Sequence, residues 1–209
     1  APTEPSLELL GLFPAFHVNN AGGIQVSGEL AWSAIVSACA AEGKRVHALQ
    51  VDLSNSAPAN RTENSSVTHT RLDAALRVLR GRWSPSTILC WHADLVRLLP
   101  LIHGAQRRVF FLHRIEAWQN PGWLKRRLIS NIDHLLVNSE YTLARALEAM
   151  QQLQDMQSEV VPLGIGTPIE GPVRAPDAIP AAIMIGRLEH GERYKGHDVV
   201  IAAWPHVLH

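Results

Sequence analysis

The feature that most constrains the fold is an alternation, along almost the whole chain, between short apolar runs and segments of helical periodicity. The runs are mostly apolar on both faces, which is typical of strands buried inside a parallel sheet. The expected strands are Leu7–Phe13, Arg45–Val51, Thr87–Trp91, Val109–Leu112, His134–Val137 and Val160–Val161. Because helical segments separate them, the sequence predicts an α/β fold, a parallel sheet with helices on both faces.

The segments between these runs carry helix signals of different kinds. Apolar or small residues recur at helical spacing from Ile24 to Ala38, and Gly43 then ends the helix. A second helix is marked by leucines at helical spacing, and its arginines are expected to point to water. These residues are Leu72, Leu76 and Leu79, and Arg71, Arg77 and Arg80. Further helices are expected at Ala93–Ile102, Pro121–Asn131 and Ser139–Gln152, with Ser139 as a helix cap.

Two segments lack any periodicity. Asp52–His69 is rich in Asn, Ser and Pro and predicts a mobile loop. Gly164–Pro180 is rich in Gly and Pro and predicts a linker, after which Ala181–Ile185 is expected to start a second sheet. The predicted organisation is a first domain over residues 1–165, a linker over 166–180, and the beginning of a second domain over 181–209.

Composition excludes several classes of function. Lys and Arg together number 19, as do Asp and Glu, so no overall positive charge favours nucleic acid as a partner. Cys39 and Cys90 lie in apolar stretches without a CxxC pattern, which indicates reduced thiols. No uninterrupted apolar run approaches the roughly 18 residues of a membrane span, and no secretion signal opens the chain, so a cytoplasmic location is expected.

Polar residues follow most of the expected strands directly. In sheets of this kind, ligands bind beyond the carboxyl ends of the strands. The positions that follow strands are Gly22-Gly23, His92, the stretch His113 to Glu116, Asn138-Ser139-Glu140, and Gly186-Arg187. They are the candidate binding residues, except that His92 is expected mainly to start a helix.

Five stretches, taken in order, resemble one family, the retaining GT-B glycosyltransferases that use nucleotide sugars. Within that fold the similarity is to the large group containing sucrose-phosphate synthases and bacterial mannosyl- and glucosyltransferases. The stretches are "NNAGGIQVSGELAWSAI", "FFLHRIEAW", "HLLVNSEYTLARAL", "VVPLGI" and "IMIGRLEHGERYKGHDVVIAAW". The resemblance runs from the first strand to the last residue.

This resemblance implies two Rossmann-like domains facing a cleft, with the acceptor mainly on the first and the donor nucleotide mainly on the second. Transfer would retain the configuration of the sugar and deliver it to a glycan, a lipid-linked molecule or a small molecule. Arg187 and Lys195 match the family's pair that binds the donor diphosphate. An arginine fork and a lysine point charge suit a leaving group that gains negative charge. Gly22 and Gly23 match a loop that approaches the donor phosphate closely.

The resemblance also assigns residues near the transferred sugar. His113 matches a family histidine expected to bind and polarise the sugar, and no side chain is assigned as a nucleophile. Glu116, Ser139 and Glu140 are candidates for contacts with the acceptor. No metal is expected, because the eleven histidines include no HExxH pattern and no pair at ligand spacing with carboxylate support.

The segment from Trp123 to Arg127 has a basic amphipathic pattern. Such a helix can lie on an anionic membrane surface, which would suit a lipid-linked acceptor and a peripheral location at the inner face of the membrane. An ordinary helix that covers the core would show the same pattern. Both interpretations stay open at this point.

Three other functions fit parts of the sequence. A nicotinamide-dependent oxidoreductase would use the same sheet, with Asp52 at the end of the second strand as a ribose ligand, but GxGxxG is absent. A GT-B sugar epimerase would share the fold, and a non-enzymatic sugar-binding module is the third possibility. The family also carries two glutamates in the second domain that would lie beyond His209, so the chain by itself is expected to be an inactive, truncated enzyme.

Overall fold

The computed structural model describes residues 7–16, 23–53, 62–81, 83–113, 122–164, 171, 183–184, 186 and 195–207. The chain divides into two compact units, Ala1–Thr167 and Pro168–His209. The first unit contains the sheet and most of the helices, and the described residues of the second include one helix, α6.

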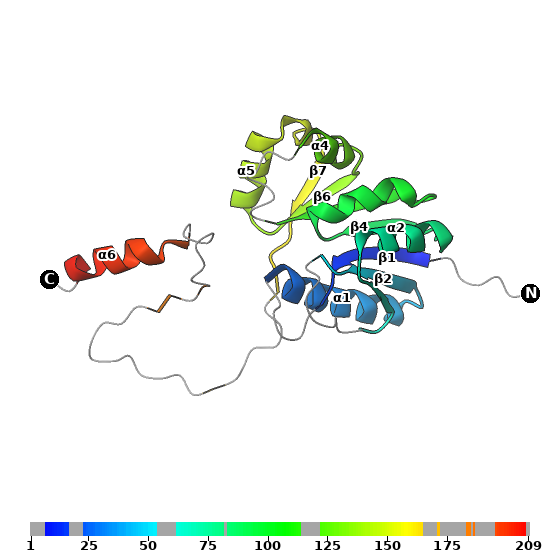
Figure 1. Ribbon diagram of the computed structural model, residues 1–209, viewed down its shortest axis with the longest axis horizontal. Helices are drawn as coiled ribbons and strands as arrows, with labels where there is room; N and C mark the ends of the chain where they lie inside the picture. Colours follow the sequence, from blue (N-terminus) through cyan, green and yellow to red (C-terminus); the bar gives the residue numbers. More distant parts are fainter. Residues whose placement is uncertain are drawn as a thin grey trace, which may run out of the picture. The chain divides into compact units, whose positions relative to one another are not determined.

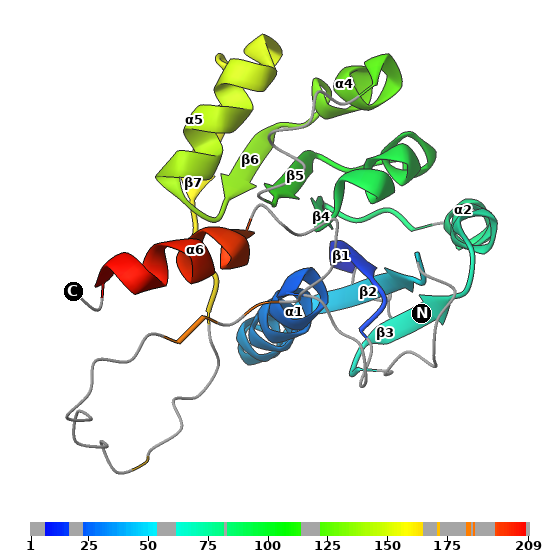
Figure 2. The same cartoon turned by 60° about the vertical axis from the view of Figure 1, so that its left-hand side comes forward.

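The first unit is built on a seven-stranded sheet in which every neighbouring pair of strands is parallel (Figures 1 and 2). The strands lie in the order β3-β2-β1-β4-β5-β6-β7. Their bounds are β1 Leu7–Pro14, β2 Arg45–Val51, β3 Ser65–Thr68, β4 Thr87–Cys90, β5 Arg107–Leu112, β6 His134–Val137 and β7 Gln157–Val160.

Helices cover both faces of this sheet (Figure 2). Their bounds are α1 Gly23–Ala41, α2 Arg71–Arg80, the 3₁₀ helix η1 Ala93–Leu101, α4 Trp123–Ile129, α5 Glu140–Ala149 and the short 3₁₀ helix η2 Gln151–Leu153; α6 of the second unit is His197–Val207. The prediction of an α/β fold with a Rossmann-like parallel sheet and helices on both faces is therefore confirmed.

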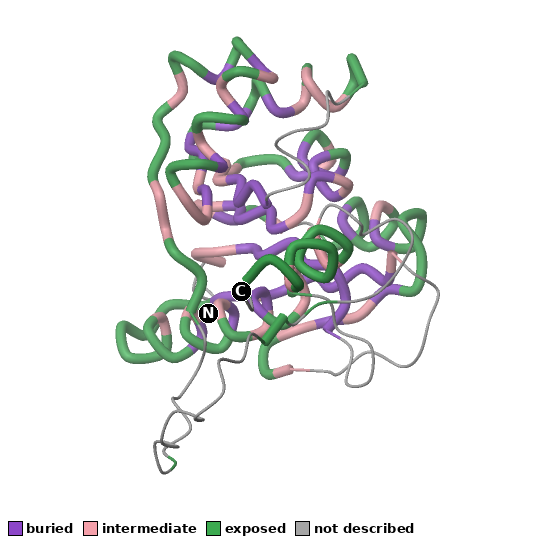
Figure 3. The backbone as a smooth tube through the Cα atoms, turned by 90° about the vertical axis from the view of Figure 1, so that its left-hand side faces the viewer, coloured by how far each residue is buried: buried purple, intermediate pink, exposed green. Residues whose placement is uncertain are grey.

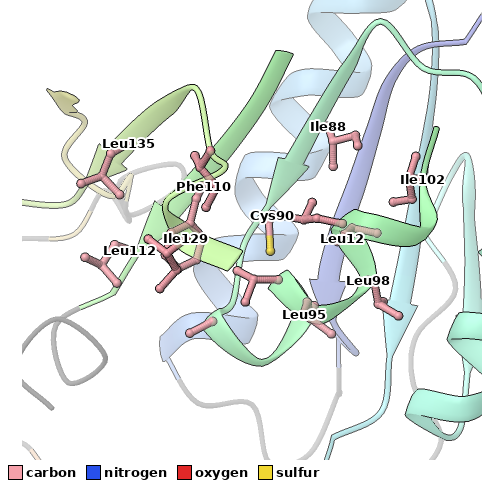
Figure 4. Packing of buried hydrophobic residues seen from close by; sticks show 14 of the residues in the cluster. Leu12, Ile88, Cys90, Leu95, Leu98, Ile102, Phe110, Leu112, Ile129 and Leu135 are labelled. Carbon is pink, nitrogen blue, oxygen red and sulfur yellow. The ribbon is translucent and has the colours of Figure 1, made fainter. Parts of the chain in front are cut away.

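Two hydrophobic clusters pack on opposite faces of the sheet because alternate strand residues point to opposite sides. On one face, Leu12, Cys90 and Phe110 pack under η1, α2, α4 and α5 (Figure 4). On the other, Phe13 and Trp91 pack with α1, through residues that include Trp32 and Val36. Figure 3 colours the backbone by burial; buried residues, in purple, occur in strands such as β1 and β4 and also in η1.

The strand order creates a switch point beside β1. The chain leaves β1 for β2 and β3 on one side and then crosses to β4 on the other side of β1. In doubly wound sheets, connections that leave in opposite directions open a crevice at the carboxyl ends of the strands. The position of the crevice in this fold is therefore between β1 and β4.

The prediction of a mobile loop over Asp52–His69 was wrong in part. Residues 65–68 form the edge strand β3, which pairs with β2. Side chains of β2 complete this pairing: Gln50 Nε2 donates to Ser65 Oγ at 3.0 Å, and a ring nitrogen of His47 lies 2.9 Å from Ser66 Oγ. A polar segment becomes a strand here because its partner strand supplies hydrogen bonds. Residues 54–61 lie outside the described part of the chain.

The second helix was predicted correctly and its arginines are exposed as expected, but the leucines that marked it are largely exposed as well. The buried residues of α2 are Ala74 and Val78, whereas Leu72 and Leu79 are 69% and 56% exposed. Arg71 does not simply point to water, because it forms an ion pair with Asp94. Small residues allow α2 to lie close to the sheet, and its leucines form an outer apolar face.

Other predicted elements differ in smaller ways. The helix expected at Ala93–Ile102 is the 3₁₀ helix η1, with Pro100 inside it. Of the strand expected at Ala181–Ile185, the two described residues, Ile183 and Met184, are not in a strand. Among the described helices, only α1 is long and apolar enough to cross a membrane, by length and composition alone. This is weak evidence, since Trp32 and Val36 of α1 belong to the core.

Candidate functional site

The carboxyl ends of β1, β2 and β4 border a cavity of ≈ 270 Å³ at the switch point. Its wall combines the end of β1, Leu53 after β2 and the first turn of α1. Besides Gln25 in that turn, three polar side chains complete it: Arg71, His92 and Asp94. A cavity in this position, with convergent polar groups, has the properties of a ligand site.

One carboxylate organises the charges beside the cavity. Asp94 Oδ1 lies 2.6 Å from Lys125 Nζ, and Asp94 Oδ2 lies 3.0 Å from Arg71 Nη2. Burial raises the pKa of Asp94, but the hydrogen bond and charge of Lys125, with His92 and Arg71, together hold this pKa below its ordinary value. The carboxylate is therefore ionised at neutral pH, and the cluster of Arg71, Asp94 and Lys125 carries a net charge of one positive unit.

His92 is fixed by its role as a helix cap, as the sequence indicated. Its Nδ1 accepts a hydrogen bond from the Asp94 backbone N–H at 3.1 Å. Burial is the main cause that lowers the pKa of His92. The charge of Asp94 partly offsets this effect, and the charges of Lys125 and Arg71 add to it. The ring is therefore neutral at pH 7, and because Nδ1 is the acceptor, its proton lies on Nε2.

His113 follows β5 and is buried in an aromatic environment. Its ring lies 4.9 Å from that of Phe111 and 5.3 Å from that of Trp91, measured between centroids, and its side chain is 4% exposed. Burial lowers the pKa of His113 to about 4, although a hydrogen bond with the Trp91 backbone raises it. At neutral pH the ring is an uncharged hydrogen-bonding group, which agrees better with binding and polarising a ligand than with donating a proton as a cation.

A second polar group lies beside His113 at the same edge of the sheet. Leu112 and Val137 are paired across β5 and β6, so His113 and Asn138 follow them on neighbouring strands. His113 Nε2 and Asn138 Oδ1 are both buried, and neither has a hydrogen-bond partner among the described residues. Unsatisfied buried groups are uncommon in structural cores, so these two, at the carboxyl ends of neighbouring strands, are candidates for pairing with a ligand or with water.

The other described candidate binding residues of the first unit lie at the starts of helices α1 and α5. Gly23 is the first residue of α1. Ser139 caps α5 by accepting from the Thr142 backbone N–H at 3.2 Å, which confirms its predicted capping role. Glu140 is exposed in the first turn of α5. Their contacts with donor or acceptor stay predictions, and Gly22 and Glu116 lie outside the described residues.

In the second unit, Lys195 lies next to the predicted phosphate loop. A Cβ added to Gly186 would lie 3.1 Å from Lys195 Cδ and 2.9 Å from a ring carbon of His197. The absence of a side chain at Gly186 therefore lets Lys195 approach the backbone at the residue before Arg187. Arg187 itself lies outside the described residues.

A larger hollow of ≈ 530 Å³ lies away from the switch point, between the end of β3 and α2. It is lined mainly by the outer side chains of α2, such as Leu76 and Arg80, and by Trp83. It is more open than the switch-point cavity, and its lining residues include none of the described residues that directly follow β4, β5 and β6. The smaller cavity is therefore the better candidate.

The sequence did not predict a site role for several residues that the fold brings to the carboxyl ends of the strands. Arg71 was assigned to solvent and Lys125 to a possible membrane surface, and Asp94 was given no role. Asn138 was identified only by its position after a strand. Arg71, Asp94 and Lys125 come from α2, η1 and α4, so no local spacing links them. No group of three or more His, Cys, Asp or Glu side chains within the described residues could hold a metal ion.

Comparison with known proteins does not extend these observations: no family model matches the chain, and no curated protein matches it.

Proposed function

We propose that the protein is a retaining glycosyltransferase that moves a sugar from a nucleoside diphosphate sugar to a glycan, lipid-linked or small-molecule acceptor. The observation that carries this proposal is the polar cavity at the switch point, and the buried, neutral His113 after β5 supports it. The order of the five sequence stretches supports it further. In this proposal the first unit binds the acceptor and the transferred sugar, and the second unit binds the donor diphosphate.

The chemistry that this proposal requires is stabilisation of a leaving group. As the glycosidic bond breaks, negative charge develops on the diphosphate, and fixed cations and backbone N–H groups lower its energy. Lys195, beside Gly186, would supply one such charge in the second unit, together with Arg187. His113 would hold a hydroxyl of the sugar through Nε2, a buried nitrogen that has no hydrogen-bond partner among the described residues.

The test is equilibrium titration of the chain with UDP, GDP, ADP and NADH, followed by tryptophan or cofactor fluorescence. We expect one nucleoside diphosphate to bind and Lys195→Ala to weaken its binding by at least about tenfold, since a hydrogen bond to a charged group is lost. Lys44→Ala is the matched control, because Lys44 forms an ion pair with Glu42 at the surface after α1. The proposal would be contradicted if Lys195→Ala and Lys44→Ala bound the diphosphate equally well, or if the chain bound none of UDP, GDP and ADP.

A nicotinamide-dependent oxidoreductase is the second candidate, and one observation favours it. Asp52 follows β2 and is 8% exposed, in the position where Rossmann domains hold a ribose. Against it, eight residues, Ala15 to Gly22, separate β1 from α1, which is longer than the tight turn that holds a dinucleotide pyrophosphate. Binding of NADH in preference to every nucleoside diphosphate would decide for this candidate.

A further inference from the structure

We infer that the switch-point cavity binds a phosphoryl group, and that the acceptor of the proposed transfer is therefore a phosphorylated molecule. That the phosphorylated molecule is an acceptor rests on the proposed function. The phosphate site itself follows from the charges and dimensions of the cavity. Arg71 makes the direct contact with the phosphoryl group, and Lys125 has an indirect, electrostatic role.

Arg71 provides the cation of the cavity wall. Among the described residues, its guanidinium is paired only with Asp94, through Nη2, and 53% of its side chain is exposed. A guanidinium has several donors in one plane, so a contact through one nitrogen leaves others available for a second acceptor. Phosphate oxygens fit this planar fork better than they fit a single point charge.

Lys125 prevents Asp94 from cancelling the charge of Arg71. An isolated ion pair between Arg71 and Asp94 would be neutral and would attract an anion weakly. Because Lys125 Nζ binds the other oxygen of the same carboxylate at 2.6 Å, the three groups together keep one positive charge beside the cavity. Asp94 thus fixes the position of both cations without neutralising them. His92, which lines the same wall, is neutral and adds no opposing charge.

The first turn of α1 adds to the same field. Ile24 and Gln25 line the cavity, and they lie at the start of a helix that runs from Gly23 to Ala41. The first N–H groups of a helix have no partners within the helix, and its N-terminus carries a partial positive charge. At ≈ 270 Å³ the cavity is slightly below the usual range for small-molecule sites, so it suits a single phosphorylated headgroup or monosaccharide.

The experiment measures phosphate binding directly, without sugar transfer. The 209-residue chain is titrated calorimetrically with glucose 6-phosphate and with glucose, and is sedimented with phosphatidylcholine vesicles with and without phosphatidic acid. These arms distinguish a soluble phosphomonoester from a lipid headgroup. We expect glucose 6-phosphate or the phosphatidic acid vesicles to bind and their uncharged counterparts not to bind.

Variants separate the two cations. Arg71→Met removes the direct contact and is expected to weaken binding by at least about tenfold. Lys125→Met leaves Arg71 paired with Asp94, so we expect a smaller loss, of a few fold, that diminishes as salt is raised. Arg71→Lys keeps the charge without the fork and should recover part of the affinity. Arg80→Met on α2 and Arg127→Met on α4 are matched controls, since neither residue lines this cavity.

The outcome is independent of the donor site. Binding that requires Arg71 supports the inference even where no nucleoside diphosphate binds, a result that would refute the proposed function alone. Nucleoside diphosphate binding that depends on Lys195, without binding of either phosphate probe, would overturn the inference and leave the proposed function in place. Equal affinities of Arg71→Met and Arg80→Met for the phosphate probe would also overturn it. Circular dichroism of each variant establishes that the fold is retained.

Discussion

Substitution of His113 by Phe tests whether the stability of the fold depends on an uncharged histidine at this position. His113 packs against Phe111 and Trp91, and its Nε2 has no partner among the described residues. A phenyl ring has nearly the same shape and cannot take up a proton. The substitution therefore removes titration at this position while conserving the aromatic packing.

The expected magnitude follows from the pKa of His113, which burial lowers from 6.5 to about 4. A histidine in the unfolded chain takes up its proton near pH 6.5, whereas the buried ring takes it up only near pH 4. Because the unfolded state binds the proton first, the contribution of His113 is complete above pH 6.5 and is lost as the pH falls towards 4. A tenfold difference in proton affinity corresponds to about 1.4 kcal/mol, so the loss is about 3 kcal/mol.

The assay is urea unfolding followed by far-ultraviolet circular dichroism, at several pH values between 7.5 and 4. The quantity of interest is the free energy of unfolding of the wild type minus that of His113→Phe at each pH. His47 and His92, whose pKa values are also lowered by burial, are present in both proteins and so largely cancel. The difference should decrease by about 3 kcal/mol as the pH falls. A difference that stays constant between pH 6.5 and 4 would refute the reasoning.

Two further predictions concern α1 and α4. Gly28→Ala places a Cβ 3.0 Å from Trp91 Nε1, which is held by a hydrogen bond to the Ile24 carbonyl. It should therefore lower the free energy of unfolding by about 1–3 kcal/mol despite the gain in helix propensity, as thermal unfolding can measure. Trp123 is 74% exposed on α4, so Trp123→Ala should reduce sedimentation with anionic vesicles if α4 contacts a membrane. Equal pelleting of the wild type and Trp123→Ala would exclude that contact.

The order of strands and helices could be predicted because buried parallel strands are recognisable as short apolar runs. β3 was missed for a physical reason: Ser65–Thr68 is polar and lies at the edge of the sheet, where hydrogen bonds from β2 side chains favour the strand. Edge strands lack the continuous apolar pattern of central ones. In α2, leucines and small residues recur on different sides with the same helical period, so periodicity predicted the helix but not which side is buried.

The site was predictable only where a residue follows its strand directly. His92 and His113 could be identified from sequence because the end of a strand fixes their position. The charge cluster could not, since Arg71, Asp94 and Lys125 meet only when α2, η1 and α4 pack together. Paired charges on separate helices resemble solvated surface residues in any local reading of the sequence.

The charge and the size of the cavity together favour one class of ligand over the others considered. A dinucleotide needs a close turn between the first strand and helix and a long crevice, whereas this cavity is small and follows an eight-residue connection. Asp94 does not cancel the charge of Arg71, because Lys125 binds the same carboxylate. A neutral glycan would gain little from this remaining positive charge. A small phosphorylated molecule uses both features, because its charge pairs with Arg71 and its size fits between the carboxyl ends of β1, β2 and β4. The Arg71–Asp94 pair is better explained as part of an anion site than as a contribution to stability, since Arg71 is half exposed and such ion pairs stabilise a fold only slightly.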